Sequence, residues 1–139
     1  MRCSTSSYTC GPSAAAAVLA VYGITKTEGE MAVKSFTLPH GGTTVHQGCY
    51  AINQVFIEEG HQQRYHLQGI RNLQRPQDLS YPCLTAIKLP LINHMVCLKG
   101  VNSKGQIMMA DPHSGPTTIS WKHLQTICLG GVVASPIPQ

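Results

Sequence analysis

A cysteine lies at the point where a helix is expected to begin. The segment "SSYTCGPSAAAAVLAVYG", residues 6–23, places Cys10 just before a glycine, a proline and a run of alanines. Alanine favours helices, proline is tolerated in a first turn and Gly23 can end the helix, so a helix is predicted over about 11–22. A thiol at the start of a helix lies beside unsatisfied N–H groups and the positive end of the dipole, which lowers its pKa. Cys10 is therefore a candidate nucleophile, although a small buried thiol in a capped helix would give the same pattern.

A catalytic thiol needs a base within hydrogen-bond reach and usually a third group that orients the base. The spacing of one predicted hairpin, "HMVCLKGVNSKGQIMMAD", selects His94 as the base among the chain's seven histidines. If Val101 pairs with Gln106, then Val96 lies opposite Asp111, and His94 and Asp111 become diagonal neighbours on one face of the sheet. The prediction depends on this register, because a slip of one residue would put the two side chains on opposite faces.

The elements that must position these residues can be read along the chain. A capping box at Thr27 and Glu30 marks a second helix, and an apolar face that ends at Gly60 marks a third. The expected helices cover 11–22, 25–36, 44–59 and 120–127, and Ser120 is expected to cap the last of them. The expected strands cover 64–69, 83–89, 94–101, 106–111 and 130–136. Loops are expected at 38–44 and at 73–81, the second with one helical turn. Helices thus precede antiparallel strands, which predicts an α+β domain rather than alternating βαβ units.

The composition is that of a globular protein, and at 139 residues the chain is expected to form one domain over 1–139. Apolar residues make up 42% and charged residues 12%, and the net charge of +4 comes from scattered lysines and arginines. Without a basic run, nucleic acid is not expected as a partner. No signal peptide and no apolar run of about 18 residues is present, so a soluble, cytoplasmic protein is expected.

Six cysteines lie at positions 3, 10, 49, 83, 97 and 128, without a C-x-x-C pair. We expect mostly free thiols, and Cys97 and Cys128 read as small core residues. His61 and His66 match no zinc pattern, and no metal or cofactor is expected. Trp121 is expected to anchor the last helix on the sheet, and one of the two adjacent methionines, Met108 or Met109, is expected in the core.

Three segments of the chain resemble the motifs of a known family. "SYTCGPSAAAAVLAVYG", "NHMVCLKGV" and "MMADPHSG" are similar, in this order, to the three motifs of the C39 peptidases. These are papain-like cysteine peptidases of bacteriocin and double-glycine peptide exporters, together with stand-alone relatives. The resemblance spans about residues 4–135 and implies a papain-like fold with N-terminal helices packed on a C-terminal antiparallel sheet. It also implies Cys10 as nucleophile, His94 as general base and then acid, and Asp111 as the orienting carboxylate.

One feature departs from the family pattern. The family usually carries a glutamine about six residues before the cysteine, and its amide contributes to the oxyanion hole. This chain has Ser4 at that spacing, or Cys3 if the segment aligns one residue longer. Loss of one oxyanion donor typically costs about 10²–10³ in turnover, so reduced or absent activity is an open alternative.

The resemblance implies peptide or protein substrates, among them leader peptides cut after small residues such as Gly-Gly. It also implies a transporter or other membrane-protein context outside this segment, with the domain at the cytoplasmic face of the assembly. Two alternatives to a peptidase stay open at this point. One is a C39-like domain that binds a peptide or partner without cutting it, and the other is a transferase that uses the same thioester.

Overall fold

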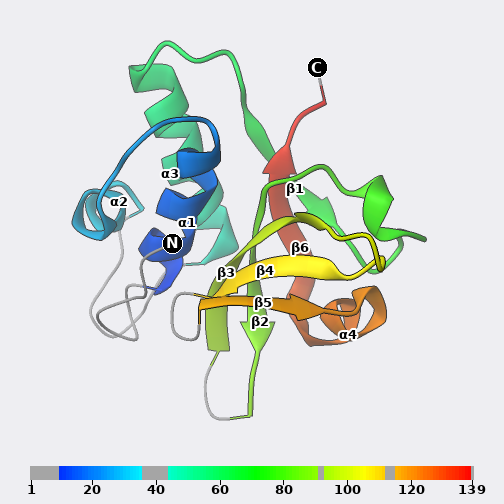
Figure 1. Cartoon of the computed structure of the whole chain (residues 1–139). Helices are drawn as coiled ribbons and strands as arrows, with labels where there is room; N and C mark the ends of the chain where they lie inside the picture. The colour runs from blue at the N-terminus through cyan, green and yellow to red at the C-terminus, as the bar shows by residue number, and fades with distance from the viewer. Residues whose placement is uncertain (1–9, 36–43, 91–92, 112–114, 139) are drawn as a thin grey trace.

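A computed structural model of the chain describes residues 10–35, 44–90, 93–111 and 115–138. Within these residues, two helices cover one face of an antiparallel sheet, and a third helix packs on these two on the side away from the sheet (Figure 1). A fourth helix, α4 (Trp121–Ile127), packs on the opposite face. Helices come first in the chain and most strands follow, so the predicted α+β class is confirmed.

Helix α1 (Cys10–Val21) is apolar on nearly every side, as expected of a helix that is buried rather than half exposed. Val18 and Leu19 are completely buried, and the alanines allow neighbouring elements to approach closely. The helix packs against β3 (Asn93–Val101) and the next two helices. Gly23 follows with φ of +78°, so the predicted helix and its glycine stop are confirmed.

Helices α2 (Glu28–Lys34) and α3 (Val45–Glu58) begin with side-chain caps. The Glu30 backbone N–H donates to Thr27 Oγ1 at 3.0 Å, and the Thr27 N–H donates back to Glu30 at 3.2 Å, which confirms the predicted capping box. Thr44 and Gln47 form a second box that the sequence analysis did not anticipate. The predicted apolar face of α3 is buried, and most of the predicted loop at 38–44 lies outside the described residues.

The described strands form one six-stranded sheet in the order β1-β6-β2-β3-β4-β5, with every neighbouring pair antiparallel. Beside β3, the strands are β1 (Tyr65–Gly69), β2 (Cys83–Lys88), β4 (Ile107–Asp111), β5 (Gly115–Ile119) and β6 (Cys128–Pro136). The helical turn expected within 73–81 is a 3-10 helix, Pro76–Asp78, and Ser120 caps α4 as predicted.

Strand β5 was not predicted, because its sequence, "GPTTI", lacks the alternation of a half-buried strand. Only Ile119 is buried, while Pro116 and the two threonines are exposed. The strand pairs only with β4, at the edge of the sheet, where a proline without an N–H donor is tolerated. Its conformation therefore follows from the partner strand rather than from its own residues.

The hairpin register expected between β3 and β4 is wrong at the turn. Val101 pairs with Ile107 rather than with Gln106, because the Asn102 side chain accepts backbone N–H groups from Lys104 and Gln106 and holds a longer turn. An irregularity between Leu98 and Gly100 then shifts the pairing by one residue, so that Cys97 lies opposite Ala110. This bulge restores, farther along the strands, the register that was predicted.

Alternate residues along the strands divide the interior into two cores. The helix-side core joins the helices to one sheet face and includes Val18, Leu19, Ile52, Val55, Phe56, Leu84, Met95, Cys97, Ala110 and Ala134. The α4-side core lies on the other face and includes Ile70, Leu79, Cys83, Ile87, Val96, Leu98, Ile107, Met109, Leu124, Cys128 and Val133. Trp121 packs against the α4-side core as predicted, and Met109 is buried there whereas Met108 is 38% exposed.

Candidate active site

Cys10 is the first residue of α1, as the sequence predicts. Its side chain lies outside the described part of the structure, but its place in the backbone is at the end where a helix leaves its first N–H groups unsatisfied. Gly11 and Pro12, which complete the first turn, are buried. Helix α1 contacts both β3 and β4, the strands that carry the other two predicted site residues.

His94 is the second residue of β3, and its side chain is only 6% exposed. It lies opposite Ile87 of β2, and strand alternation puts it on the same face as Val96. Met95 and Cys97 belong instead to the helix-side core, beneath α1. A contact between His94 and Cys10 would therefore lie at the end of the sheet where β3 begins, rather than under the middle of the helix.

Asp111 is the last residue of β4, and its side chain also lies outside the described part of the structure. The β3–β4 register places Cys97 opposite Ala110, and one further step along both strands puts Asp111 opposite Val96. Val96 is two residues from His94, so the backbone positions of His94 and Asp111 are diagonal neighbours on adjacent strands. The approach of the three side chains to one another stays a prediction.

The four described cysteines outside the candidate site are all buried and have free thiols. Burial raises the pKa of Cys49 and Cys128, raises that of Cys97 to about 12, and raises that of Cys83 well above its usual range. A neutral thiol is a poor nucleophile. These four are therefore structural residues, and the core positions predicted for Cys97 and Cys128 are confirmed.

The histidines outside the candidate site have ordinary surroundings where they are described. His61 Nδ1 accepts the Gln63 backbone N–H at 3.2 Å, and His46 is exposed on α3. His40 and His113 lie outside the described residues. Among the side chains that the structure describes, no three His, Cys, Asp or Glu residues gather as a metal site would require.

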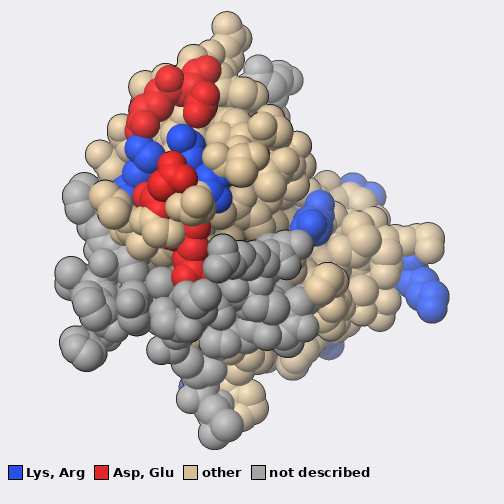
Figure 2. All heavy atoms as spheres, turned by 60° about the vertical axis from the view of Figure 1, so that its left-hand side comes forward, with Lys and Arg blue, Asp and Glu red and all other residues tan. Residues whose placement is uncertain are grey.

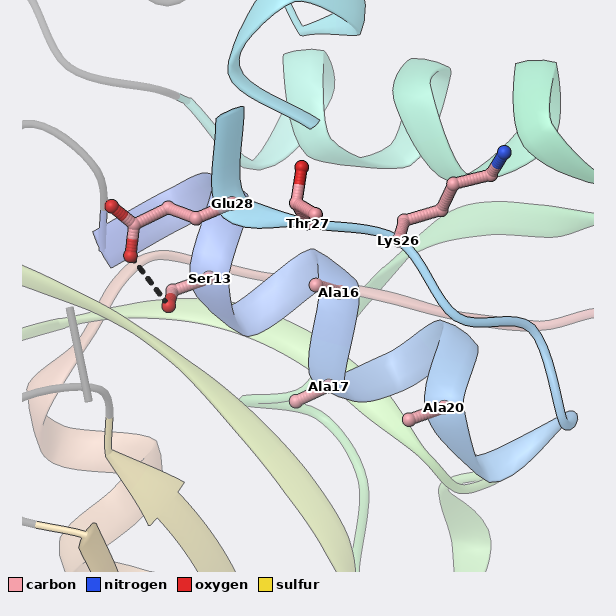
Figure 3. A pocket seen from close by; sticks show the side chains of 7 residues that line it. All are labelled: Ser13, Ala16, Ala17, Ala20, Lys26, Thr27 and Glu28. Carbon is pink, nitrogen blue, oxygen red and sulfur yellow. Dashed lines mark hydrogen bonds between the residues drawn. The ribbon is translucent and has the colours of Figure 1, made fainter. Parts of the chain in front are cut away.

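A cavity of about 250 Å³ lies along α1, between this helix and residues 26–28 (Figure 3). Ala16, Ala17 and Ala20 line it on the side of α1. At one end, one turn after Cys10, the Ser13 hydroxyl donates to a Glu28 carboxylate oxygen at 3.2 Å. No local sequence pattern predicts this pair, because the two residues lie 15 positions apart in the chain.

Charged side chains of both signs gather over the helical layer (Figure 2). Lys26 lies 3.8 Å from Glu30 and 3.6 Å from Glu59, and Lys34 contacts Glu58. These ion pairs connect α2 and the segment before it to the end of α3. Because they are partly exposed, each is expected to contribute less than about 1 kcal/mol.

Solved peptidase domains share this architecture. The peptidase domain of Streptococcus ComA, a bifunctional ABC transporter of a quorum-sensing pathway, aligns over 99% of this chain and 97% of its own with a TM-score of 0.77 at 20% identity. A double-glycine motif protease from an AMS/PCAT transporter, solved with its leader peptide, aligns over 99% and 89% with a TM-score of 0.72 at 19% identity. The peptidase domain of Streptococcus mutans ComA gives a TM-score of 0.66 over 99% and 98% at 18% identity. The predicted papain-like fold of the C39 peptidase domain is therefore confirmed.

Three further findings bear on identity. None of the described helices has the length and apolar character that crossing a bilayer requires. No curated protein sequence gives a significant match. A family model, however, matches residues 2–127, nearly the whole chain and all three predicted site residues. The chain therefore belongs to the Peptidase_C39 like family.

Proposed function

We propose that the chain is a cysteine endopeptidase in which Cys10 is the nucleophile, His94 the general base and then acid, and Asp111 the carboxylate that orients the imidazole. The observation that carries the proposal is the meeting of three elements. The β3–β4 register makes the positions of His94 and Asp111 diagonal neighbours, and α1, which begins at Cys10, contacts both strands. Membership of a peptidase family supports the same assignment.

The proposed reaction is acyl transfer through a thioester. The Cys10 thiolate attacks the carbonyl carbon of the scissile peptide bond, and the resulting oxyanion faces the backbone N–H groups at the start of α1. The intermediate collapses when His94 protonates the leaving amine, which breaks the C–N bond. Water, deprotonated by His94, then attacks the thioester and releases the carboxylic acid together with the free thiol. The protein's own side chains supply every proton transfer in this sequence.

We propose peptides cut after small residues, such as a Gly-Gly pair, as the substrate class. The support is indirect: one protein of similar fold is a double-glycine motif protease solved with a leader peptide. The same comparison supports a setting beside a peptide-exporting transporter, with the domain at its cytoplasmic face.

A second candidate is a domain that holds a peptide without cutting it. It is favoured by the residues before Cys10, where Ser4 or Cys3 stands in place of the family's oxyanion-hole glutamine. A hydroxyl or thiol on a short side chain is a weaker and less extended donor than a glutamine amide. Under this reading the peptide still binds along the start of α1, but the oxyanion is not stabilised.

The first test is the pH dependence of Cys10 alkylation by iodoacetamide, mapped by peptide mass, in the wild type and in His94→Ala. An assembled pair gives a thiolate that reacts well below pH 7, and the substitution moves its pKa toward the free-thiol value of about 8.5. His46→Ala is the matched control, since His46 is exposed on α3. A wild-type Cys10 that titrates like a free thiol, unchanged in His94→Ala, would overturn the proposal.

Turnover separates the peptidase from the binding domain. A fluorogenic peptide that ends in Gly-Gly-aminomethylcoumarin should be hydrolysed by the wild type and not by Cys10→Ala. A reactive Cys10 without turnover, combined with binding of a Gly-Gly peptide to Cys10→Ala, would favour the binding domain. Replacing Ser4 by Gln should then raise turnover, by up to the 10²–10³ that one oxyanion donor typically contributes.

A further inference from the structure

One hydrogen bond joins the first turns of two helices beside the candidate nucleophile. Ser13 is only 6% exposed, and its hydroxyl donates to the carboxylate of Glu28, the first residue of α2. Ser13 follows Cys10 by three residues, so the two occupy adjacent turns of α1. The bond therefore reaches α1 within one turn of the residue proposed to attack the substrate.

This bond lies at one end of the cavity along α1. The cavity along α1 has an alanine wall, and methyl groups leave the space between α1 and residues 26–28 unfilled. In Figure 3 the Glu28 side chain extends toward Ser13, whereas the Lys26 side chain, at the other end of the segment, extends away from α1. Apolar contacts alone hold the helix start less firmly where such a space remains.

We infer that Glu28, held by the buried Ser13 hydroxyl, is a positioning residue for the Cys10 nucleophile. The inference rests on the proposed function, because it assigns a role within the same site. The bond fixes the first turn of α1 against α2, and the carboxylate places a negative charge near the positive end of the α1 dipole. That charge stabilises the helix start and at the same time opposes ionisation of the nearby thiol.

Opposition to ionisation can favour catalysis, because a thiolate with a very low pKa is a weak nucleophile. A helix start and a nearby imidazolium both lower a thiol pKa, but the intrinsic nucleophilicity of a thiolate falls as its pKa falls. A thiol whose pKa lies near the working pH reacts fastest. Glu28 thus keeps the pKa of Cys10 from falling farther than its catalytic role requires.

Among the described residues, other titratable or charged groups lie on the elements that α1 contacts. On the strands, these are His94 and the exposed Lys99 of β3, Asp111 of β4 and the exposed Lys88 at the end of β2. On the helical side, Lys26 pairs with Glu30 and Glu59, and Lys34 pairs with Glu58.

Two substitutions separate the charge of Glu28 from its anchoring role. Glu28→Gln keeps an acceptor for Ser13 and removes the charge, so the pKa of Cys10 measured by alkylation should fall by about half a unit, the size expected when one nearby, partly screened negative charge is removed. Ser13→Ala keeps the charge but releases it from α1, so the pKa should fall by less. Turnover of the Gly-Gly-aminomethylcoumarin peptide should fall about tenfold in Ser13→Ala, since small misplacements can cost up to about 10². Glu30→Gln is the matched control, a second α2 carboxylate that contacts Thr27 and Lys26.

The outcomes distinguish this inference from the proposed function. Suppose that the pKa of Cys10 in the wild type is low and depends on His94. If Glu28→Gln then changes this pKa no more than Glu30→Gln does, the inference is overturned and the proposed peptidase function stands. A wild-type Cys10 with an ordinary thiol pKa overturns the proposed function instead. Thermal unfolding of each variant verifies its fold, and Glu28→Gln still decides the charge effect if Ser13→Ala does not fold.

Discussion

The two faces of the sheet are closed by different kinds of structure. On the helix-side core lie α1 and α3, which are 12 and 14 residues long. On the α4-side core lies a helix of 7 residues together with the segment that carries Ile70 and Leu79. The helix-side cover, α1 and α3, consists of long helices with their own start and stop signals. The α4-side cover, α4 and the segment with Ile70 and Leu79, consists of short elements that are bonded to distant parts of the chain.

Side-chain hydrogen bonds to backbone carbonyl groups connect the elements of the α4-side cover. The Gln125 amide donates to the carbonyl oxygens of Ile70 at 2.7 Å and Leu73 at 3.0 Å. Arg71 donates to the Cys128 carbonyl oxygen at 2.9 Å. A short helix is marginal by itself, so α4 depends on these contacts, whereas α3 is twice as long and has a capping box at its start.

The comparison bears on the candidate site, because its residues come from both sides. Cys10 begins a helix that covers one face, and His94 shares the opposite face with Val96. We therefore propose that the triad forms at the end of the sheet, between the two covers. Loosening of either cover is expected to disturb it.

Removal of a large core side chain should have the greatest effect on stability, and a greater one on the helix side. Phe56 is completely buried and packs against the rings of Tyr22, His61 and Tyr65. Phe56→Ala should lower the free energy of unfolding by about 4 kcal/mol, and Leu124→Ala on the other face by about 3 kcal/mol. Urea unfolding followed by circular dichroism measures both. A larger loss for Leu124→Ala would mean that α4, despite its length, carries the more stable core.

Alkaline pH should weaken both cores through their buried thiols. The folded pKa of Cys97 is raised to about 12, and burial raises that of Cys83 well above its usual range, so both keep their protons after the unfolded chain has ionised. Their stabilisation is complete below the unfolded pKa, about 8.5, and is lost as pH rises toward the folded pKa. From pH 8 to pH 10, Cys97 should account for a loss of about 2 kcal/mol.

Single substitutions assign that loss to one face or the other. Cys97→Ala, on the helix side, and Cys83→Ala, on the α4 side, should each flatten the decline between pH 8 and pH 10 in urea unfolding. A profile unchanged by both would show that neither thiol is linked to folding.

Removal of a helix cap should have the smallest effect and again distinguish the two covers. Thr44 caps α3 and takes part in a capping box, whereas Ser120 caps α4 with one bond to the His123 N–H at 3.2 Å. Thr44→Ala should cost about 1 kcal/mol and Ser120→Ala about 0.5 kcal/mol. Thermal unfolding compares the two at matched protein concentration. Equal losses would argue that α4 depends on its cap as strongly as α3 does.

Local signals in the sequence determined the helices and the residue types of the candidate site. The alanine run after Cys10, the threonine and serine caps and the glycine stops act over a few residues, so they can be read before any contact is known. The hairpin residues around His94 and Asp111 were also recognisable from their alternation. The segments around Cys10, His94 and Asp111 resemble three motifs of the C39 peptidases in the same order. This resemblance indicated the family that the family model over residues 2–127 then established.

Only the tertiary structure decided how these pieces meet. The turn at Asn102 and the bulge before Gly100 set the register that relates His94 to Asp111. β5 is a strand because it pairs with β4. The Ser13–Glu28 bond joins two helices that no short-range pattern connects. Caps and periodicity depend on neighbours along the chain, but register, edge pairing and buried cross-links depend on neighbours in space.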